Sequence, residues 1–315
     1  MFATLAGSYP RPAELTTAEA RRVVLGAQAD SGLGLLSDGS VHRSDDAPTL
    51  VEAWTVAGAA ASAEGIELPV KLAVLGPWAR LARPADPERQ RAGGADASPG
   101  AVAVAAHVAA ERLAAALAAV VEAGCPVVEI HEPAVSLPAG PGAGEAFSSV
   151  HRTLLGRLPS DAHATLAIMG GDAEALGAGS LFGLAYRSYL FDLIAGPDSW
   201  RTIAKAPGDR GIIVGVADAT GARDTRMEEV AWAAGYAASL GGRGMTRVGL
   251  APSGGLEGLD PARALVLIGL LGETARLLVG DPEELLRRLD PRAVDLRSAA
   301  RGMYRPERGE RPTGR

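Results

Sequence analysis

The sequence predicts an α/β fold, a single (β/α)8 TIM barrel that spans residues 1–300. Short apolar runs alternate with stretches of helical length along the whole chain. The runs are almost continuously apolar, as is typical of parallel strands buried on both faces. Eight repeats of strand and helix favour closure into a barrel over an open sheet. The runs cover residues 3–7, 34–38, 70–76, 127–133, 164–169, 186–193, 211–218 and 247–252.

The segments between these runs have the length and apolar content of barrel helices. Two begin with recognisable signals: Thr16 precedes Glu19, and Asp260 precedes Pro261. No glycine-rich dinucleotide fingerprint follows the first run, where the sequence is GSYPRP, so an open nucleotide-binding sheet lacks its usual support. Residues 301–315 are basic and contain proline and glycine, and we expect a disordered tail there.

Composition excludes several classes of partner. The net charge is −6 and the pI is about 5.5, which disfavours nucleic acid and anionic membranes, since both require a basic surface. The single cysteine, Cys125, allows no internal disulfide. No basic leader and no uninterrupted apolar span is present. We therefore expect a cytoplasmic protein with a small-molecule substrate, and a homodimer remains open.

Polar side chains gather where the predicted strands end. Barrel enzymes place their chemistry on the loops at the carboxyl ends of the strands. Here those ends carry Asp, His, Glu and Arg beside the glycine and proline of the turns, whereas the strand starts are plain. A turn alone accounts for the glycine and proline but less well for the charged residues. This asymmetry predicts a site at the carboxyl-terminal mouth of the barrel.

Several of these segments, in order and at barrel spacing, resemble the catalytic barrel of cobalamin-independent methionine synthase. The first is GSYPRPAEL, which resembles a Gly-Ser-Phe/Tyr-Pro-Arg motif after the first strand. The most specific is AGCPVVEIHEPAV, which is similar to a family segment with Asp-Glu-Pro at the end of the fourth strand. The others are GLGLLSDGSVHR, KLAVLGP, IIVGVADA and VGLAPSGGLEGL. The resemblance implies a barrel related in fold to that family and to uroporphyrinogen decarboxylase.

The residues that would hold the family's zinc ion differ in this chain. The resemblance implies a His and a Cys after strand five, a Glu after strand six and a Cys after strand eight. Ala167 and Met169 stand at the first two positions and Gly254 at the last, while Asp192 is the acid nearest strand six. One carboxylate cannot form a four-ligand zinc site. We therefore predict no bound metal and no zinc-dependent thiol methyl transfer.

The resemblance also implies substrate contacts that have changed. Ser40 stands where the family has a Glu, and His131 where it has an Asp. Both family carboxylates would face the ammonium group of homocysteine, so we do not expect that substrate.

The candidate catalytic residues are His131, Glu132 and Asp192. An imidazole can act as a general acid or base near neutral pH. Glu132 could orient His131 or bind a cation, although Glu132 before a proline could instead hold backbone amides at a turn.

Nine further residues are predicted to bind substrate. Arg43 and Arg11 suit a carboxylate or phosphate, although each could also form a local ion pair. Trp78 could stack on a planar ligand or simply pack at the rim. The full set is Tyr9, Arg11, Asp38, Ser40, His42, Arg43, Trp78, Asp218 and Ser253.

Three functions follow as hypotheses. The first is a diverged, zinc-free member of the methionine-synthase-like group that acts on a small polar or anionic metabolite, with a folate as co-substrate for one-carbon transfer. The second is a metal-free lyase or decarboxylase resembling the uroporphyrinogen decarboxylase group. The third is a non-catalytic ligand-binding or partner subunit.

Overall fold

The structure is a computed structural model, which describes residues 1–11, 13–82, 87–92 and 98–289. The predicted tail at 301–315 and the last residues of the predicted barrel domain lie outside this range.

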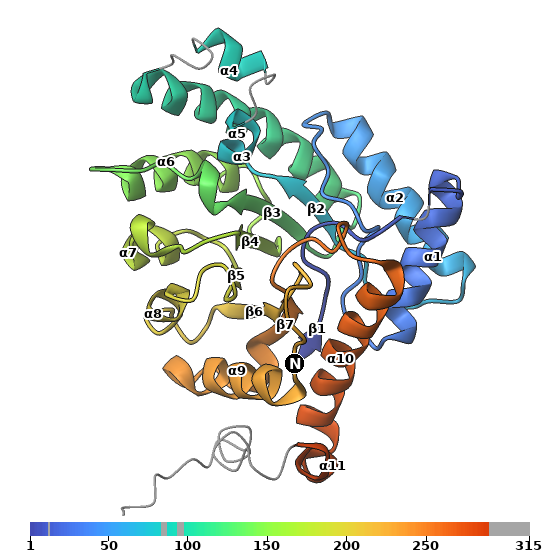
Figure 1. Cartoon of the computed structure of the whole chain (residues 1–315). Coiled ribbons are helices and arrows are strands. Elements are labelled where there is room, and N and C mark those ends of the chain that lie inside the picture. The colour runs from blue at the N-terminus through green and yellow to red at the C-terminus, as the bar shows by residue number, and fades with distance from the viewer. Residues whose placement is uncertain (12, 83–86, 93–97, 290–315) are drawn as a thin grey trace, which may run out of the picture.

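The centre of the fold is a curled sheet of seven parallel strands in the order β1-β7-β6-β5-β4-β3-β2 (Figure 1). Seven of the eight predicted runs overlap a strand, and the run at 164–169 coincides with its strand completely. The strands are β1 (Phe2–Ala3), β2 (Leu72–Leu75), β3 (Val128–Pro133), β4 (Ala164–Met169), β5 (Ser188–Asp192), β6 (Gly211–Ala217) and β7 (Val248–Pro252).

The run at 34–38 does not form a regular strand, so the prediction of eight strands is corrected to seven. This segment lies between the two edges of the sheet, with single parallel bridges from Leu35 to Thr4 and from Leu36 to Val70. The buried amide of Gln28 accepts from the backbone N–H of Ser37 and donates to its carbonyl. These are the backbone groups that a continuing strand would share with a neighbour, so pairing stops there.

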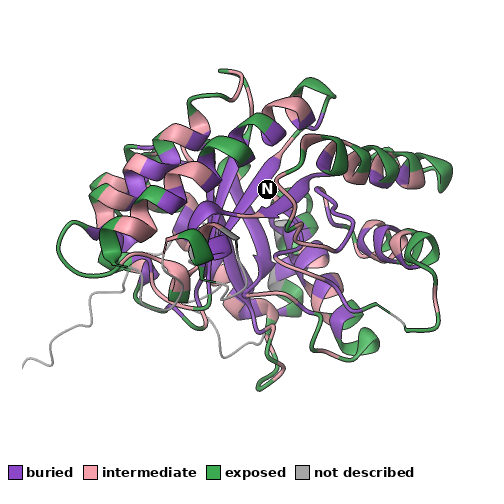
Figure 2. Ribbon diagram, turned by 90° about the horizontal axis from the view of Figure 1, so that it is seen from above, coloured by how far each residue is buried: buried purple, intermediate pink, exposed green. Residues whose placement is uncertain are grey.

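The helices lie outside the sheet and cover it (Figures 1 and 2). The predicted start signals are confirmed: Thr16 and Glu19 form a capping box, and Asp260 caps the helix that begins with Pro261. The helices are α1 (Thr17–Asp30), α2 (Ala47–Ala63), α3 (Pro77–Leu81), α4 (Pro87–Arg91), α5 (Pro99–Glu122), α6 (Ala143–Leu155), α7 (Ala178–Phe182), α8 (Ser199–Ile203), α9 (Met227–Ser239), α10 (Pro261–Gly280) and α11 (Pro282–Arg288).

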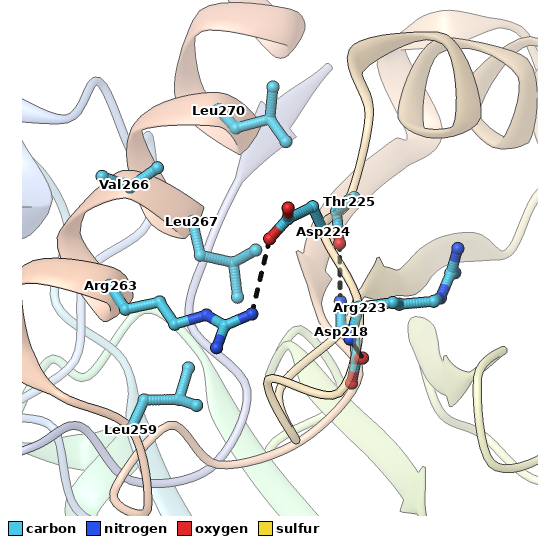
Figure 3. Close-up of a pocket in the computed structure, with 9 residues that line it drawn as sticks. All are labelled: Asp218, Arg223, Asp224, Thr225, Leu259, Arg263, Val266, Leu267 and Leu270. Atoms are coloured by element: carbon cyan, nitrogen blue, oxygen red, sulfur yellow. Dashed lines mark hydrogen bonds and ion pairs between the residues drawn. The ribbon is translucent and has the colours of Figure 1, made fainter.

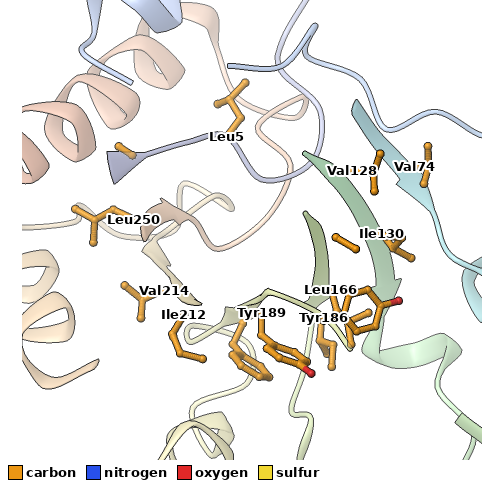
Figure 4. Close-up of a cluster of buried hydrophobic side chains, with 14 of the residues drawn as sticks. Leu5, Val74, Val128, Ile130, Leu166, Tyr186, Tyr189, Ile212, Val214 and Leu250 are labelled. Carbon is orange, nitrogen blue, oxygen red and sulfur yellow. The ribbon is translucent and has the colours of Figure 1, made fainter. Parts of the chain in front are cut away.

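Side chains alternate between the two faces of the sheet and form two apolar clusters. The large cluster fills the space between strands and helices and includes Val128, Ile130, Leu166 and Val214 (Figure 4). The small cluster lies on the inner face and consists of Ala6, Ala167, Met169, Leu190, Ile213 and Ala251. Because the inner cluster is small, the inner face has room for polar side chains.

Helix α5 is long and apolar enough to cross a membrane by length and composition alone. Half of its most apolar stretch is buried inside the protein, where α5 packs against α2, α3 and α6. That packing is typical of the core helix of a soluble protein.

Candidate functional site

A chain of three charged or titratable side chains runs from Lys71, the residue before β2, along the inner face of β3. The Nζ atom of Lys71 donates to Oε2 of Glu129 at 2.7 Å and to the carbonyl of Leu5 at 2.7 Å. The other oxygen of Glu129 lies 2.7 Å from Nε2 of His131. All three side chains are almost completely buried. A buried charge is stable only when it is paired and hydrogen-bonded, and each member here satisfies the next.

Glu129 is ionised in this setting. Burial opposes its charge, but the Lys71 ammonium and the hydrogen bond with His131 outweigh that effect and lower the pKa of Glu129 to about 2. A carboxylate can only accept a hydrogen bond, so Nε2 of a neutral His131 must carry the proton. Nδ1 is then the unprotonated nitrogen, and it has no hydrogen-bond partner among the described residues. The arrangement presents an oriented imidazole with one basic nitrogen available.

Apart from Glu129, the neighbours of His131 across the sheet are apolar. Its strand neighbours in register are Leu75 on β2 and Ala167 on β4. Met169 follows Ala167 on the same face, two residues further along β4. A polar group on an apolar wall marks the point at which a ligand would find directional bonding.

Glu132 lies on the opposite face of β3 from His131, so the expectation that it orients the imidazole is corrected: Glu129 does so. The carboxylate of Glu132 is fully buried and accepts from the backbone N–H groups of Trp78 (3.1 Å) and Ala79 (2.7 Å). It thereby caps the first turn of α3. A Cβ atom at Gly76 would collide with this carboxylate, which explains the Gly-Pro turn before α3.

His42 and Asp38 form a second polar group beside the sheet. Nε2 of His42 lies 3.1 Å from Oδ2 of Asp38, while Oδ1 of Asp38 accepts from the backbone N–H of Ser40 at 3.0 Å. His42 makes a parallel bridge to Val74 of β2. Since β2 is the neighbour of β3, this loop lies next to β2, one strand away from the strand that carries His131.

The predicted anion contacts are exposed. Arg11 donates to the hydroxyl of Ser40, which joins the first loop to the loop at 38–43. The side chain of Arg43 is exposed and makes no ion pair with any described residue, so the predicted alternative of a salt bridge with Asp38 or Asp45 is absent in this part of the chain.

Tyr9 and Trp78 are both buried rather than open at a rim. Burial raises the pKa of Tyr9, whose backbone N–H donates to the carbonyl of Gly39. Nε1 of Trp78 is buried and has no hydrogen-bond partner in the described structure.

The remaining predicted residues hold the loops after the strands. Asp192 accepts from the backbone N–H groups of Gly170, Ile194 and Ala195, each at 2.9 Å. Asp218 accepts from the backbone of Thr220 and Arg223. Partial burial opposes ionisation of Asp218, but its bonds to Thr220 and to the Arg223 amide hold its pKa below the usual range. The hydroxyl of Ser253 accepts from the N–H of Ala219. All three carry hydrogen bonds within the loops that follow β5, β6 and β7.

The donor set does not fit a zinc ion at the family's position. Ala167 and Met169 belong to the inner apolar cluster, and Gly254 brings no ligand atom. Within the described ranges no three His, Cys, Asp or Glu side chains converge in a way that could hold a metal ion. A thioether and two residues without donor atoms are poor ligands for zinc.

No protein-family profile matches the sequence. No curated protein matches it either. Solved structures do resemble it in fold. A B12-independent methionine synthase from Shewanella sp. W3-18-1, in complex with selenomethionine, has a TM-score of 0.68 at 14% identity, covering 90% of this chain and 98% of that one. A Listeria monocytogenes protein described as a vitamin-B12-independent methionine synthase has a TM-score of 0.63 at 15% identity, covering 89% and 98%. A methyltransferase from Methanosarcina mazei has a TM-score of 0.58 at 14% identity, covering 87% and 92%. At these identities the likeness is one of fold, and the chain shares the α/β architecture of barrel enzymes of the methionine synthase kind.

Proposed function

We propose that this protein is a zinc-independent, cytoplasmic enzyme of the methionine-synthase-like barrel group that transfers a one-carbon unit to a small polar or anionic metabolite. The observation that carries the proposal is the buried chain from Lys71 through Glu129 to His131. Such a chain is costly to bury unless something requires it, because an apolar substitute is often equally stable. Functional sites are where such perturbed groups concentrate.

His131 would act as the general base. With Nε2 held by Glu129, Nδ1 can accept a proton from an acceptor O–H, N–H or S–H group as a methyl group moves to that acceptor. The positive charge that forms on the imidazole is stabilised by the ionised Glu129 behind it. If a folate is the donor, the nitrogen that loses the methyl group takes up a proton, so the exchange is balanced. A base that deprotonates the acceptor would replace the activation that zinc provides in the family.

Arg11 and Arg43 would bind the anionic part of the substrate. Both guanidinium groups are exposed on loops that Arg11 joins by its bond to Ser40, and Arg43 has no ion-pair partner among the described residues. A free guanidinium fork matches a carboxylate or phosphate in geometry.

Replacement of His131 by alanine is expected to slow transfer by several orders of magnitude. The protein, treated with chelator, would be incubated with methyl-labelled methyltetrahydrofolate and a set of thiol, amine and hydroxyl acceptors that carry a carboxylate. Loss of a general base lowers the rate roughly 10²- to 10⁴-fold. His107→Ala is the matched control, because His107 lies on α5 and, among the described residues, bonds Thr153 and Ser149. Product formation would be followed by NMR and mass spectrometry.

Two outcomes would contradict the proposal. Equal activity of wild type and His131→Ala would show that His131 is not the general base. Activity that is lost with chelator and restored by zinc would show that the reaction depends on zinc. Thermal protection by carboxylates without any folate effect would instead favour the lyase alternative.

A further inference from the structure

A cavity of about 250 Å³ lies outside the sheet, between the ends of β5 and β6 and helices α8 and α9. Its apolar wall is formed by Leu193, Ile194 and Val216, and its aromatic wall by Trp200 and Trp232. We call it the α8–α9 cavity. It is separate from the inner face that carries His131, because Val216 belongs to the outer apolar core.

Aromatic residues are rare in this chain but gather at this cavity. Aromatic residues make up only 4% of the sequence, yet two of the four tryptophans line this cavity. Trp232 stacks on Tyr236 with rings 5.4 Å apart and almost parallel, and Trp200 stands nearly perpendicular to both. The three rings form a right-angled corner. Both tryptophans are only partly buried, so the corner faces the cavity rather than a closed core.

One cation borders the cavity and is held loosely. Arg223 pairs with Glu229 at 3.0 Å, and the two side chains are 46% and 29% exposed. An exposed pair of this kind contributes little to stability and exchanges easily. Glu229 also lies 3.6 Å from Arg226, so it keeps a partner if Arg223 turns to another anion.

The direction of Arg223 favours the α8–α9 cavity over a neighbouring one. A smaller cavity of about 160 Å³ lies on the other side of the same loop, against Leu267 and Leu270 of α10. Figure 3 shows the side chain of Arg223 extending away from those leucines, whereas Arg263 points toward Asp224. Arg223 borders both cavities, and its guanidinium extends to the α8–α9 side, where it pairs with Glu229.

We propose that the α8–α9 cavity binds a bicyclic aromatic carboxylate, with its rings against Trp200 and Trp232 and its carboxylate on Arg223. Size supports two fused rings, since a cavity of about 150 Å³ already accommodates benzene. Stacked and edge-on aromatic walls favour a flat apolar ligand. A guanidinium at one end favours a carboxylate. This site is independent of the proposed transfer reaction.

Calorimetric titration with 1-naphthoate tests the proposal on the full-length protein. Saturable binding is expected, about fivefold weaker in Arg223→Gln, because one charge-assisted contact is lost. Glu229→Gln removes the competing carboxylate and is expected to tighten binding, an effect that packing alone would not produce. Arg201→Gln is the matched control: it is an exposed arginine on α8 that pairs with Glu174 and Asp198 and does not line the cavity.

A second ligand and a second variant keep the result clear. The affinity for the neutral 1-naphthamide should be the same in Arg223→Gln as in the wild type. Ile194→Trp, which fills the cavity, should abolish binding of both ligands. The proposal is overturned by an absence of saturable binding, by equal weakening in Arg223→Gln and Arg201→Gln, or by binding that survives Ile194→Trp but is lost in His131→Ala. The last result would place the ligand on the inner face instead.

Discussion

Replacing Lys71 by methionine is expected to destabilise the protein by about 3–5 kcal/mol, because it leaves the ionised Glu129 buried without its cation. Methionine has nearly the volume of the lysine stem, so the loss is electrostatic rather than one of packing. The double variant Lys71→Met, Glu129→Gln should recover most of this loss, since a neutral amide needs no counter-charge and can still bond His131. Urea unfolding of the four members of this cycle measures the coupling directly.

The same pair sets a pH dependence. The folded-state pKa of Glu129 is about 2, below its ordinary value of 4.5, so the pair stabilises the folded state fully above about pH 4.5. That contribution, roughly 3 kcal/mol, is lost as pH falls from about 4.5 toward 2. The slope of stability against pH in this window should be smaller in Glu129→Gln. Equal slopes, or a Lys71→Met variant as stable as wild type, would show that the pair is not coupled as described.

The alternation of side chains along β3 predicts the site better than the residues at the end of the strand do. The sequence VVEIHEP places Glu129 and His131 two residues apart on a buried strand, and therefore on one face, while Glu132 must face the other way. A prediction from the polar residues at the end of the strand selects the adjacent pair His131 and Glu132 and misses Glu129. Lys71, a charge at the start of an otherwise apolar strand, was an equally available signal, since such a residue requires a buried partner.

The strands themselves follow from apolar runs, because strands buried on both faces are mostly apolar, with most of the few polar residues on the inner face. The segment at 34–38 has the same apolar pattern, yet Gln28, a side chain of helix α1, takes the backbone groups of Ser37. That competition is tertiary and cannot be inferred from local pattern. Likewise, Asp192 bonds the N–H of Gly170, 22 residues away in the chain, and its sequence neighbours do not reveal that it holds this second loop as well as its own.

Replacing Glu132 by glutamine is expected to cost about 2–3 kcal/mol of stability, although the two side chains are nearly identical in shape. The carboxylate receives two backbone N–H groups, from Trp78 and Ala79, and its Oε1 lies 3.2 Å from Nε2 of the buried His151. Glutamine keeps one acceptor oxygen and turns an N–H₂ group toward the remaining donors, so at least one buried N–H loses its partner. Equilibrium unfolding in urea gives the magnitude, and hydrogen exchange at the Trp78 and Ala79 amides locates it. The matched control is Glu145→Gln, whose pair with Arg152 is exposed and should change stability by less than about 0.5 kcal/mol.

This variant also separates the two roles considered for Glu132. If Glu132 only holds α3 in place, the glutamine variant should lose stability and amide protection. Any fall in its activity should then recover in conditions that stabilise the fold. If Glu132 acts on the substrate, the variant should instead fold with unchanged stability and lose turnover. The geometry favours the first outcome, because Glu132 is fully buried on the outer face of β3 while His131 occupies the inner face. Full stability with lost turnover would require the carboxylate to leave the amides of α3 during the reaction. Glu132, and not Glu129, would then be the carboxylate that takes part in the reaction.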